Sequence, residues 1–288
     1  MVLGLQYLQL RAARLCLQKA ALPPEKVQLA LAGDLQAQCT ASSYAMRELG
    51  VPFAGLFGAC STMAEGLALG AALCEGGAAR NLLAMASSHF CAAERQFRTP
   101  LSYGAVRTPT AQWTATAAGC CLLQPQGEGV GIAAATFGRV QDYQVKDINN
   151  MGAAMAPAAA STLLHYFKDT GTEPQEFDCI YTGDLGQVGS QLLRELLAAE
   201  GLLIKNHVDC GCILFDANEQ SVKSGGSGPG CCAAVLCGHI LPRLRRGSQK
   251  RVLFTATGAL MSQTIFLQKE TIPAVAHLVE LRAPEKEK

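Results

Sequence analysis

The chain has 288 residues, enough to bury a substantial core, and 49% of them are hydrophobic against 16% charged, which excludes a disordered chain. The net charge of +1 gives no electrostatic reason to expect a nucleic-acid partner. The thirteen cysteines lie in apolar surroundings without any Cys-x-x-Cys pair, so we expect buried, reduced thiols and neither a metal site nor a cofactor. Polar residues interrupt positions 1–13, and no apolar run reaches about 20 residues, so we expect no secretory signal and no transmembrane helix.

The first half of the chain alternates helices with short apolar strands. We predict helices at 5–20, 41–49 and 60–74, and strands at 27–33, 53–57 and 82–87. Gly50 marks the end of the second helix, because glycine readily adopts the left-handed conformation that often follows a helix. A long connection at 88–112 then leads to strands at 114–123 and 129–139, which we expect to pair as a hairpin.

The second half repeats this alternation. A loop and helix at 147–168 precede a strand at 179–182 and a helix at 188–200. A glycine-rich turn at 225–230 then opens a helix that runs from 231 to about 241. Strands at 252–257 and 274–281 close the chain. The alternation predicts an α/β protein built on a central sheet.

The two halves are similar when Cys60 is aligned with Cys231, an offset of 171 positions. A glycine-containing turn precedes the helix in both, a glycine follows both helices, and the strand at 82–88 falls on 253–259. Two helix–strand units can match by chance, but the joint match of turn, helix, glycine breaker and strand indicates a duplicated unit. If the halves pack with pseudo-twofold symmetry, their helix N-termini direct backbone N–H groups at one pocket, which favours carboxylates or oxyanions.

One segment contains a cysteine at the start of a predicted helix. Residues 58–67, GACSTMAEGL, resemble the nucleophile turn of thiolases and ketoacyl synthases. Other segments make the similarity specific to the stage V sporulation protein AD family. These segments are SSH at 87–89, AAERQFR at 92–98, PTAQ at 109–112, NMGAAMAPAAA at 150–160, TGDL at 182–185, GGSG at 225–228, ATGAL at 256–260 and QKETIP at 268–273.

The resemblance implies a thiolase-like α/β fold with two pseudo-symmetric halves in α/β/α/β/α layers. Residues 1–145 are expected to form the N-terminal half and 146–288 the C-terminal half, with the first strand of the first half missing. The family is expected to bind dipicolinic acid and to deliver it into the developing spore with membrane-embedded partner proteins. We therefore expect dipicolinic acid as the ligand, alone or as its calcium chelate. We also expect cytoplasmic synthesis, peripheral attachment to the spore inner membrane through those partners, and self-association as a homodimer.

The resemblance also implies that catalysis has been lost. Cys60 occupies the nucleophile position, but Ser227 stands near the position where thiolases place a histidine. Asp184 stands where ketoacyl synthases of the initiating type have their histidine, and the last cysteine, Cys237, comes too early to be the second thiolase cysteine. A nucleophile without a base and an acid is poorly suited to acyl transfer, so we expect a binding protein rather than an enzyme.

Six residues are candidates for the ligand pocket: Cys60, His89, Arg95, Asp184, Gly226 and Ser227. Arg95, or Arg98 close by, would supply a guanidinium for a carboxylate, and Ser227 with the N–H groups of its glycine turn would donate hydrogen bonds. Asp184 tolerates a dianion only when it is protonated or bridged by a cation. Each candidate also has an ordinary interpretation, with the cysteine filling a tight turn, the histidine structural and the arginines on a solvated face.

Two other functions stay open on the sequence alone. The first is an acyl-thioester transferase that uses Cys60 as its nucleophile. The second is a structural scaffold whose pocket is vestigial and whose surface binds partners. Acyl-enzyme formation would distinguish the first, and insensitivity of function to pocket substitutions the second.

Overall fold

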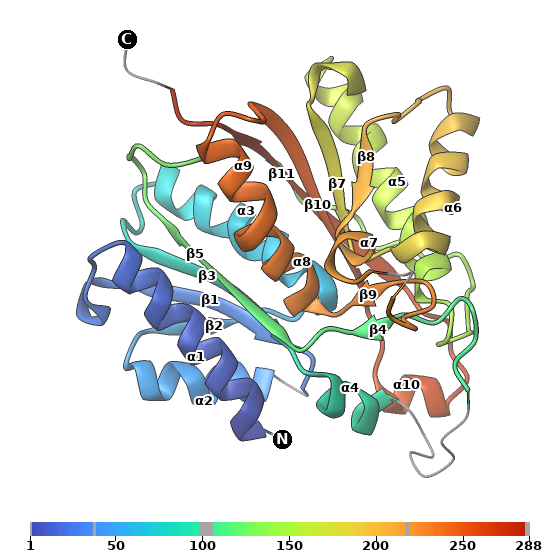
Figure 1. The fold of residues 1–288 in the computed structure, drawn as a ribbon, viewed down its shortest axis with the longest axis horizontal. Coiled ribbons are helices and arrows are strands. Elements are labelled where there is room, and N and C mark those ends of the chain that lie inside the picture. The colour runs from blue at the N-terminus through green and yellow to red at the C-terminus, as the bar shows by residue number, and fades with distance from the viewer. Residues whose placement is uncertain (1, 37–38, 98–105, 217–218, 286–288) are drawn as a thin grey trace.

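The computed structural model describes residues 2–36, 39–97, 106–216 and 219–285 and contains two large β-sheets (Figure 1). The elements of the first part of the chain are α1 (Val2–Lys19), β1 (Leu29–Asp34), α2 (Thr40–Leu49), β2 (Phe53–Gly55), α3 (Thr62–Glu75), β3 (Leu82–Ser88), α4 (Phe90–Phe97), β4 (Trp113–Thr114) and β5 (Ala117–Leu123). Those of the second part are β6 (Gly131–Thr136), α5 (Met151–Thr170), β7 (Cys179–Gly183), α6 (Gly186–Ala199), β8 (His207–Asp209), α7 (Cys210–Leu214), β9 (Gly226–Ser227), α8 (Pro229–Val235), α9 (Leu241–Arg245), β10 (Arg251–Ala259), α10 (Gln263–Leu267) and β11 (Ala274–Arg282).

The two large sheets have matching topologies. The first has the order β2-β1-β3-β5, and the second, read in the same direction, has β8-β7-β10-β11-β6. In each sheet three strands are parallel, and the next strand, β5 or β11, is antiparallel to its neighbour. The duplication inferred from the helix and strand pattern therefore extends through both sheets.

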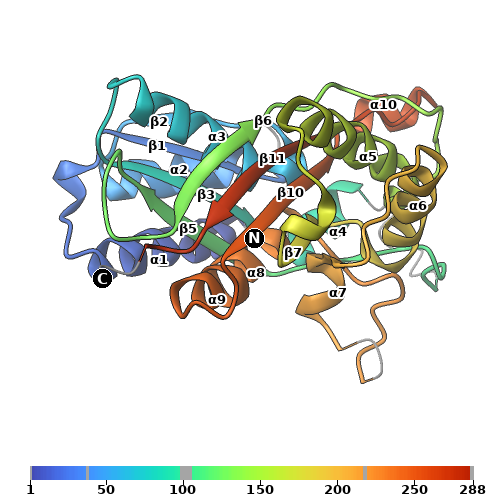
Figure 2. The same cartoon turned by 90° about the horizontal axis from the view of Figure 1, so that it is seen from above.

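The strand β6 is the one element of the second sheet without a described counterpart in the first. It pairs antiparallel with β11 and lies along it in Figure 2. Among the described residues, the equivalent edge of the first sheet ends at β5.

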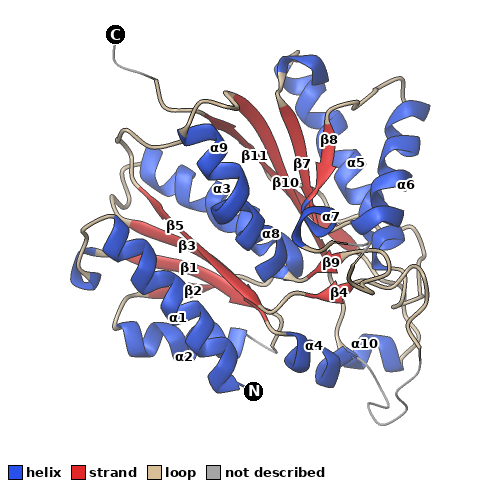
Figure 3. Ribbon diagram, in the orientation of Figure 1, coloured by secondary structure: helices blue, strands red, loops and turns tan. Residues whose placement is uncertain are grey.

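The elements form five layers (Figure 3). Helices α1 and α2 cover one face of the first sheet, and α5 and α6 cover one face of the second. Helices α3 and α8 lie between the sheets and contribute to the central core, in which Met63, Leu67 and Val235 share a cluster with Phe254 and Val279. The α/β/α/β/α arrangement expected from the sequence is confirmed.

Local sequence explains several of these elements. All seven residues of β3 are buried, as expected for a strand covered by helices on both faces. Gly50 ends α2 with φ = 73°, in the left-handed region that glycine accepts without strain. Helix α5 begins where the Asn150 side chain accepts a hydrogen bond from the N–H of Ala153 at 3.3 Å.

The structure corrects three expectations about connectivity. The strands predicted at 114–123 and 129–139 do not form a hairpin, because β5 pairs with β3 in one sheet and β6 with β11 in the other. The chain therefore enters the second sheet at β6. The connection at 88–112 contains α4, and the helix that follows the glycine-rich turn continues through a π-helical turn, Leu236–Ile240, into α9.

Among the residues that the structure describes, no helix has both the length and the apolarity needed to cross a bilayer.

Candidate ligand-binding cleft

A cavity of about 1000 Å³ opens where elements of the two halves meet. Its walls come from the loop after β1, the turn before α3, helix α4, the segment 106–114, the start of α5, Ser227 and the segment that joins β10 to α10. This volume lies at the upper end of the range for small-molecule sites. None of the described residues that line the cavity is a histidine or a tyrosine.

Cys60 lies on a tight turn that projects from the first half into this cavity. Ala59 has φ = 50°, an uncommon conformation for a residue with a Cβ, and a 3₁₀ turn at Ala59–Ser61 leads into α3. The Ser61 hydroxyl donates to the carbonyl of Gly58 at 2.6 Å and fixes the turn. Gly258 of β10 lies so close beneath it that a Cβ there would overlap the Gly58 carbonyl. The second half therefore supports the turn that carries Cys60.

Ser227 approaches Cys60 from the second half. The Cys60 Sγ and the Ser227 Oγ lie 3.9 Å apart, and the Cys232 thiol donates to the Cys60 carbonyl at 3.4 Å. The two glycine-containing turns therefore meet in one cleft, as the internal repeat predicts.

Electrostatics at the cleft keep the Cys60 thiol protonated. Burial, with a smaller contribution from the nearby Asp184, raises the pKa of Cys60 to about 12. Asp184 is fully buried, and neither of its carboxylate oxygens has a hydrogen-bond partner among the described residues. Burial, with a smaller contribution from Asp209, raises the pKa of Asp184 well above its ordinary value. Both groups therefore favour their uncharged forms.

A second buried acid, Asp209, organises the loop that carries Asp184. Its carboxylate accepts the N–H groups of Leu185 at 2.9 Å and Gly186 at 2.8 Å. The Thr182 hydroxyl donates to the same carboxylate at 2.7 Å. Burial raises the pKa of Asp209 to about 6 against the opposing effect of these donors. The loop is thus fixed by hydrogen bonds to its backbone.

The Gln112 side chain bridges two loops of the second half, the loop that carries Asp184 and the turn that carries Ser227. Gln112 itself belongs to the segment that leads out of the first half. Its Nε2 donates to the carbonyl of Asp184 at 2.6 Å and to the carbonyl of Gly226 at 2.9 Å. The adjacent backbone is paired as well, because the N–H of Trp113 donates to the Gly225 carbonyl at 2.8 Å and β4 runs parallel to β9. Gln112 therefore holds the Asp184 loop and the Ser227 turn in one arrangement.

Arg107 forms part of the cavity wall. Its guanidinium lies 4.5 Å from the Trp113 ring centroid and 5.6 Å from that of Phe90, and these two rings stack at 4.6 Å. Nη1 donates to the Gln112 carbonyl at 3.1 Å, and Nη2 forms an ion pair with Glu94. Only 15% of the Arg107 side chain is exposed. The aromatic packing and the hydrogen bonds together fix the orientation of its guanidinium.

The candidates from the sequence separate into two groups. Cys60 and Ser227 line the cavity. Asp184 is buried behind it, close enough to Cys60 to affect the thiol, and Gly226 uses its carbonyl to accept from Gln112.

The two other candidates lie away from the cavity. His89 is half-buried beside α1, with Nε2 3.7 Å from the place that a Cβ on Gly4 would occupy. Arg95 is exposed on α4 and does not line the cavity, because the residues of α4 that do are Ala93, Glu94, Gln96 and Phe97. The geometry therefore does not support Arg95 as a ligand residue. Arg98 lies outside the described residues.

Sequence reasoning missed Arg107 and Gln112. Gln112 belongs to the segment PTAQ, which carried part of the family resemblance, but nothing in the sequence indicated which carbonyls its amide would meet. Arg107 resembles any polar loop residue until Trp113 and Phe90 are placed beside it.

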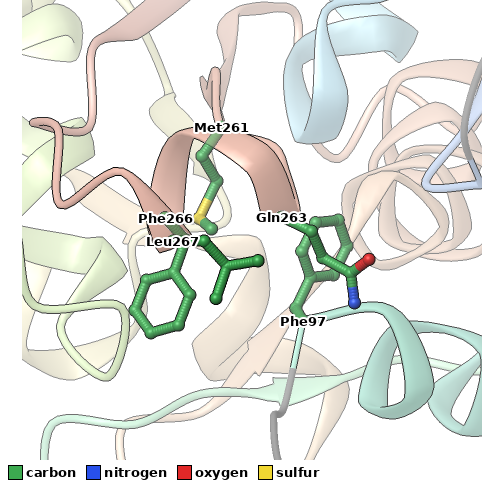
Figure 4. Close-up of a pocket in the computed structure, with 5 residues that line it drawn as sticks. All are labelled: Phe97, Met261, Gln263, Phe266 and Leu267. Carbon is green, nitrogen blue, oxygen red and sulfur yellow. The ribbon is translucent and has the colours of Figure 1, made fainter.

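The rim of the cavity is apolar where α4 and α10 approach each other. A small hollow of about 90 Å³ lies there, and Figure 4 shows the side chains around it. They are Phe97, Met261, Gln263, Phe266 and Leu267. Since Phe97, Met261 and Phe266 also line the main cavity, the hollow is an extension of its rim. Among the described residues, no group of three or more histidine, cysteine or acidic side chains is arranged to hold a metal ion.

Solved structures with a similar fold include 3-oxoacyl-[acyl-carrier-protein] synthases III and a tetronic acid condensing enzyme. The 3-oxoacyl-[acyl-carrier-protein] synthase III of Aquifex aeolicus matches with a TM-score of 0.60 and 14% identity, over 96% of this chain and 84% of that one. A variant of OleA from Xanthomonas campestris matches with a TM-score of 0.63 and 13% identity, over 96% and 81% of the two chains. These identities are too low to show more than a shared thiolase-like fold.

Sequence comparison identifies the family. Stage V sporulation protein AD of Bacillus subtilis (strain 168) is 43% identical over 267 residues, which cover 92% of this chain and 79% of that protein. The family model for stage V sporulation protein AD matches residues 5–282, nearly the whole chain. The chain belongs to the stage V sporulation protein AD family.

Proposed function

We propose that this sporulation protein binds dipicolinic acid in the cleft, without catalysing acyl transfer, and supports uptake of the ligand into the developing spore. The observation that carries the proposal is the contact between Cys60 and Ser227 at 3.9 Å in a cavity of about 1000 Å³. Burial keeps the Cys60 thiol protonated, and no described lining residue is a histidine that could activate it.

The ligand is proposed from the family membership together with the chemistry of the cleft. A carboxylate needs hydrogen-bond donors, and an uncharged thiol and a hydroxyl supply them without opposing a negative charge. The uncharged form of Asp184 removes a repulsive charge behind the same turn. The calcium chelate is a second form of the ligand, because chelation reduces the charge that the cleft must accommodate.

Partners and location belong to the same proposal. We propose that membrane-embedded proteins of the same transport system hold this protein at the spore inner membrane.

Three apolar side chains near the cleft are largely exposed: Phe57 at 64%, Val106 at 89% and Leu267 at 70%. We propose that a second copy of the chain covers Phe57 and Val106. Sedimentation velocity tests this, because Phe57→Ser should shift a dimer toward monomer, and a wild-type monomer would contradict it.

Calorimetric titration of the purified protein with dipicolinic acid, with and without calcium, tests the main proposal. Ser227→Ala removes the hydroxyl beside Cys60 and should weaken binding about 10-fold, the loss expected for one hydrogen bond to a charged group. Ser221→Ala is a matched control, because Ser221 is exposed in the same segment of the chain. A folded wild-type protein that binds neither form of the ligand would reject the proposal.

Acyl-thioester transfer by Cys60 is the second candidate, and two observations favour it. The similar structures include a 3-oxoacyl-[acyl-carrier-protein] synthase III and a tetronic acid condensing enzyme, and the cavity is larger than one pyridine ring requires. The experiment is intact-protein mass spectrometry after incubation with acyl-coenzyme A thioesters, with Cys60→Ser as the control. A stoichiometric acyl adduct that depends on Cys60 would establish this function, and its absence would leave the binding function.

A further inference from the structure

The described part of the cavity wall contains one cation whose position is fixed. Arg107 is held between the Trp113 and Phe90 rings on one side and the Glu94 carboxylate on another, and its Nη1 donates to the Gln112 carbonyl. A guanidinium that is already ordered loses little conformational entropy when it binds a ligand. It is therefore better prepared to bind an anion than a mobile surface side chain.

The other charged side chains that line the described part of the cavity are less suited to this role. Lys146 is exposed, so water screens its charge. The Asp34 carboxylate accepts three hydrogen bonds, two from Ser42 and one from the N–H of Gln36. The Asp147 carboxylate accepts from Asn149. These two acids are satisfied locally and supply no attraction for a carboxylate.

Arg107 retains donors for a ligand. A guanidinium has five N–H groups, and the hydrogen bonds to described residues engage one on Nη1 and one on Nη2. The remaining N–H groups can bind a carboxylate in the plane of the guanidinium, with two parallel hydrogen bonds, which is the geometry that arginine favours.

We infer that Arg107 binds the second carboxylate of an aromatic dicarboxylate whose first carboxylate lies at the Cys60–Ser227 pair. This inference rests on the proposed function, because it assigns to Arg107 the recognition of a ligand that the cleft is proposed to bind. Arg107 and the Cys60–Ser227 pair line the same cavity from different segments of the chain. Arg107 thereby determines selectivity for two carboxylates over one.

A structural role for the Glu94–Arg107 ion pair would produce a different result. In that role the pair fastens α4 to the segment 106–114 and contributes to the shape of the whole cavity. Loss of Arg107 would then weaken every ligand to a similar degree. If Arg107 instead recognises one particular carboxylate, its loss weakens the binding only of ligands that carry that carboxylate. Two ligands that differ by one carboxylate therefore distinguish the two roles.

The experiment is calorimetric titration of dipicolinate (pyridine-2,6-dicarboxylate) and picolinate (pyridine-2-carboxylate) into wild type, Arg107→Gln and Arg107→Lys. Arg107→Gln should weaken dipicolinate about 10- to 100-fold, the range for a hydrogen-bonded charge pair, and should change picolinate affinity less than about 3-fold. Arg107→Lys keeps the positive charge but loses the planar guanidinium, so its dipicolinate affinity should lie between those of wild type and Arg107→Gln. Arg139→Gln, an exposed arginine, controls for loss of positive charge, and circular dichroism checks that each variant is folded.

The outcomes separate the inference from the function on which it depends. Selective loss of dipicolinate affinity in Arg107→Gln supports the assignment. A parallel loss of both ligands, or unchanged dipicolinate affinity in a folded Arg107→Gln, overturns it and leaves the proposed function intact. Absence of dipicolinate binding by wild type overturns the proposed function and the assignment together.

Discussion

The Sγ of Cys60 and the Oγ of Ser227 lie 3.9 Å apart although 167 positions separate them in the chain. Each residue belongs to a glycine-containing turn that precedes a helix of the central layer, α3 for Cys60 and α8 for Ser227. The contact therefore joins corresponding parts of the two repeats. A thiol and a hydroxyl meet there, and burial keeps the thiol protonated.

The first prediction concerns the reactivity of Cys60. Because burial raises its pKa to about 12, the thiolate fraction near pH 7.5 should be more than about 100-fold below that of an ordinary thiol. Iodoacetamide should therefore modify Cys60 far more slowly than the exposed Cys91. Peptide mass spectrometry over time measures both rates in one sample. Faster labelling of Cys60 than of Cys91 would indicate an activated nucleophile and would favour acyl transfer.

The second prediction concerns Asp184→Asn. Burial raises the pKa of Asp184 in the folded state. The wild-type carboxyl therefore does not lower the free energy of unfolding below the unfolded pKa of about 4, but lowers it progressively as pH rises through the folded pKa. Relative to wild type, the variant should gain up to about 1.4 kcal/mol of unfolding free energy per pH unit in that interval. Urea unfolding between pH 4 and 8 measures the difference.

Asp169→Asn is the control for this experiment, because Asp169 is exposed at the end of α5. Its unfolding free energy should follow that of wild type at every pH. A constant difference between Asp184→Asn and wild type across the range would mean that the buried carboxyl does not change protonation on folding.

The third prediction concerns the amide of Gln112. Gln112→Met retains much of the side-chain volume but removes the donors to the Asp184 and Gly226 carbonyls. The unfolding free energy should fall by about 2 kcal/mol, because two carbonyls lose their partners. Dipicolinate affinity should fall as well, since the loops on both sides of the cleft are no longer held together. Thermal unfolding and titration of the same preparation measure the two effects.

Gln191→Met provides a comparison, because Gln191 donates to Glu195 on the exposed side of α6. That change should alter the unfolding free energy by less than about 0.5 kcal/mol and leave binding unchanged. Equal effects of the two substitutions would show that Gln112 does not position the cleft.

The fourth prediction concerns a charge cluster away from the cleft. Burial opposes ionisation of Glu280, but hydrogen bonds from Arg251, Tyr166 and Arg282 outweigh it and lower the pKa to about 2. The ionised Glu280 therefore contributes to the free energy of unfolding above the unfolded pKa of about 4.5, and this contribution is lost as pH falls toward 2. Glu280→Gln should therefore lower the unfolding free energy at pH 7 by about 2 kcal/mol, with a much smaller difference near pH 2.

Glu176→Gln is the matched control, since Glu176 pairs with the same Arg251 but is 46% exposed. Chemical unfolding at pH 7 and under acid conditions should show a loss of less than about 1 kcal/mol for this exposed pair. If Glu280→Gln lost no more stability than Glu176→Gln, the buried cluster would not contribute as its geometry suggests.

Local pattern predicted much of the fold. The strands β1, β3, β7, β10 and β11 and the helices α1, α2, α3, α5 and α6 lie where apolar runs and glycine breakers placed them. Short elements were missed, such as β4, β8 and α7, because a two- to five-residue segment carries no periodicity. The predicted hairpin failed because β5 and β6 are equally compatible with local pairing, and only the packing of two sheets assigns them different partners.

The sequence by itself determined the duplicated α/β architecture, the family and the position of Cys60, because periodicity, glycine breakers and segment similarity are properties of short stretches. Tertiary structure decided which polar groups form the cleft. It brought Ser227 to Cys60, buried Asp184 behind them and left Arg95 in solvent. It also placed Arg107 against Trp113, in the cavity wall. The physical reason is that burial, pKa and hydrogen-bond partners depend on distances between residues far apart in the chain, which no local pattern specifies.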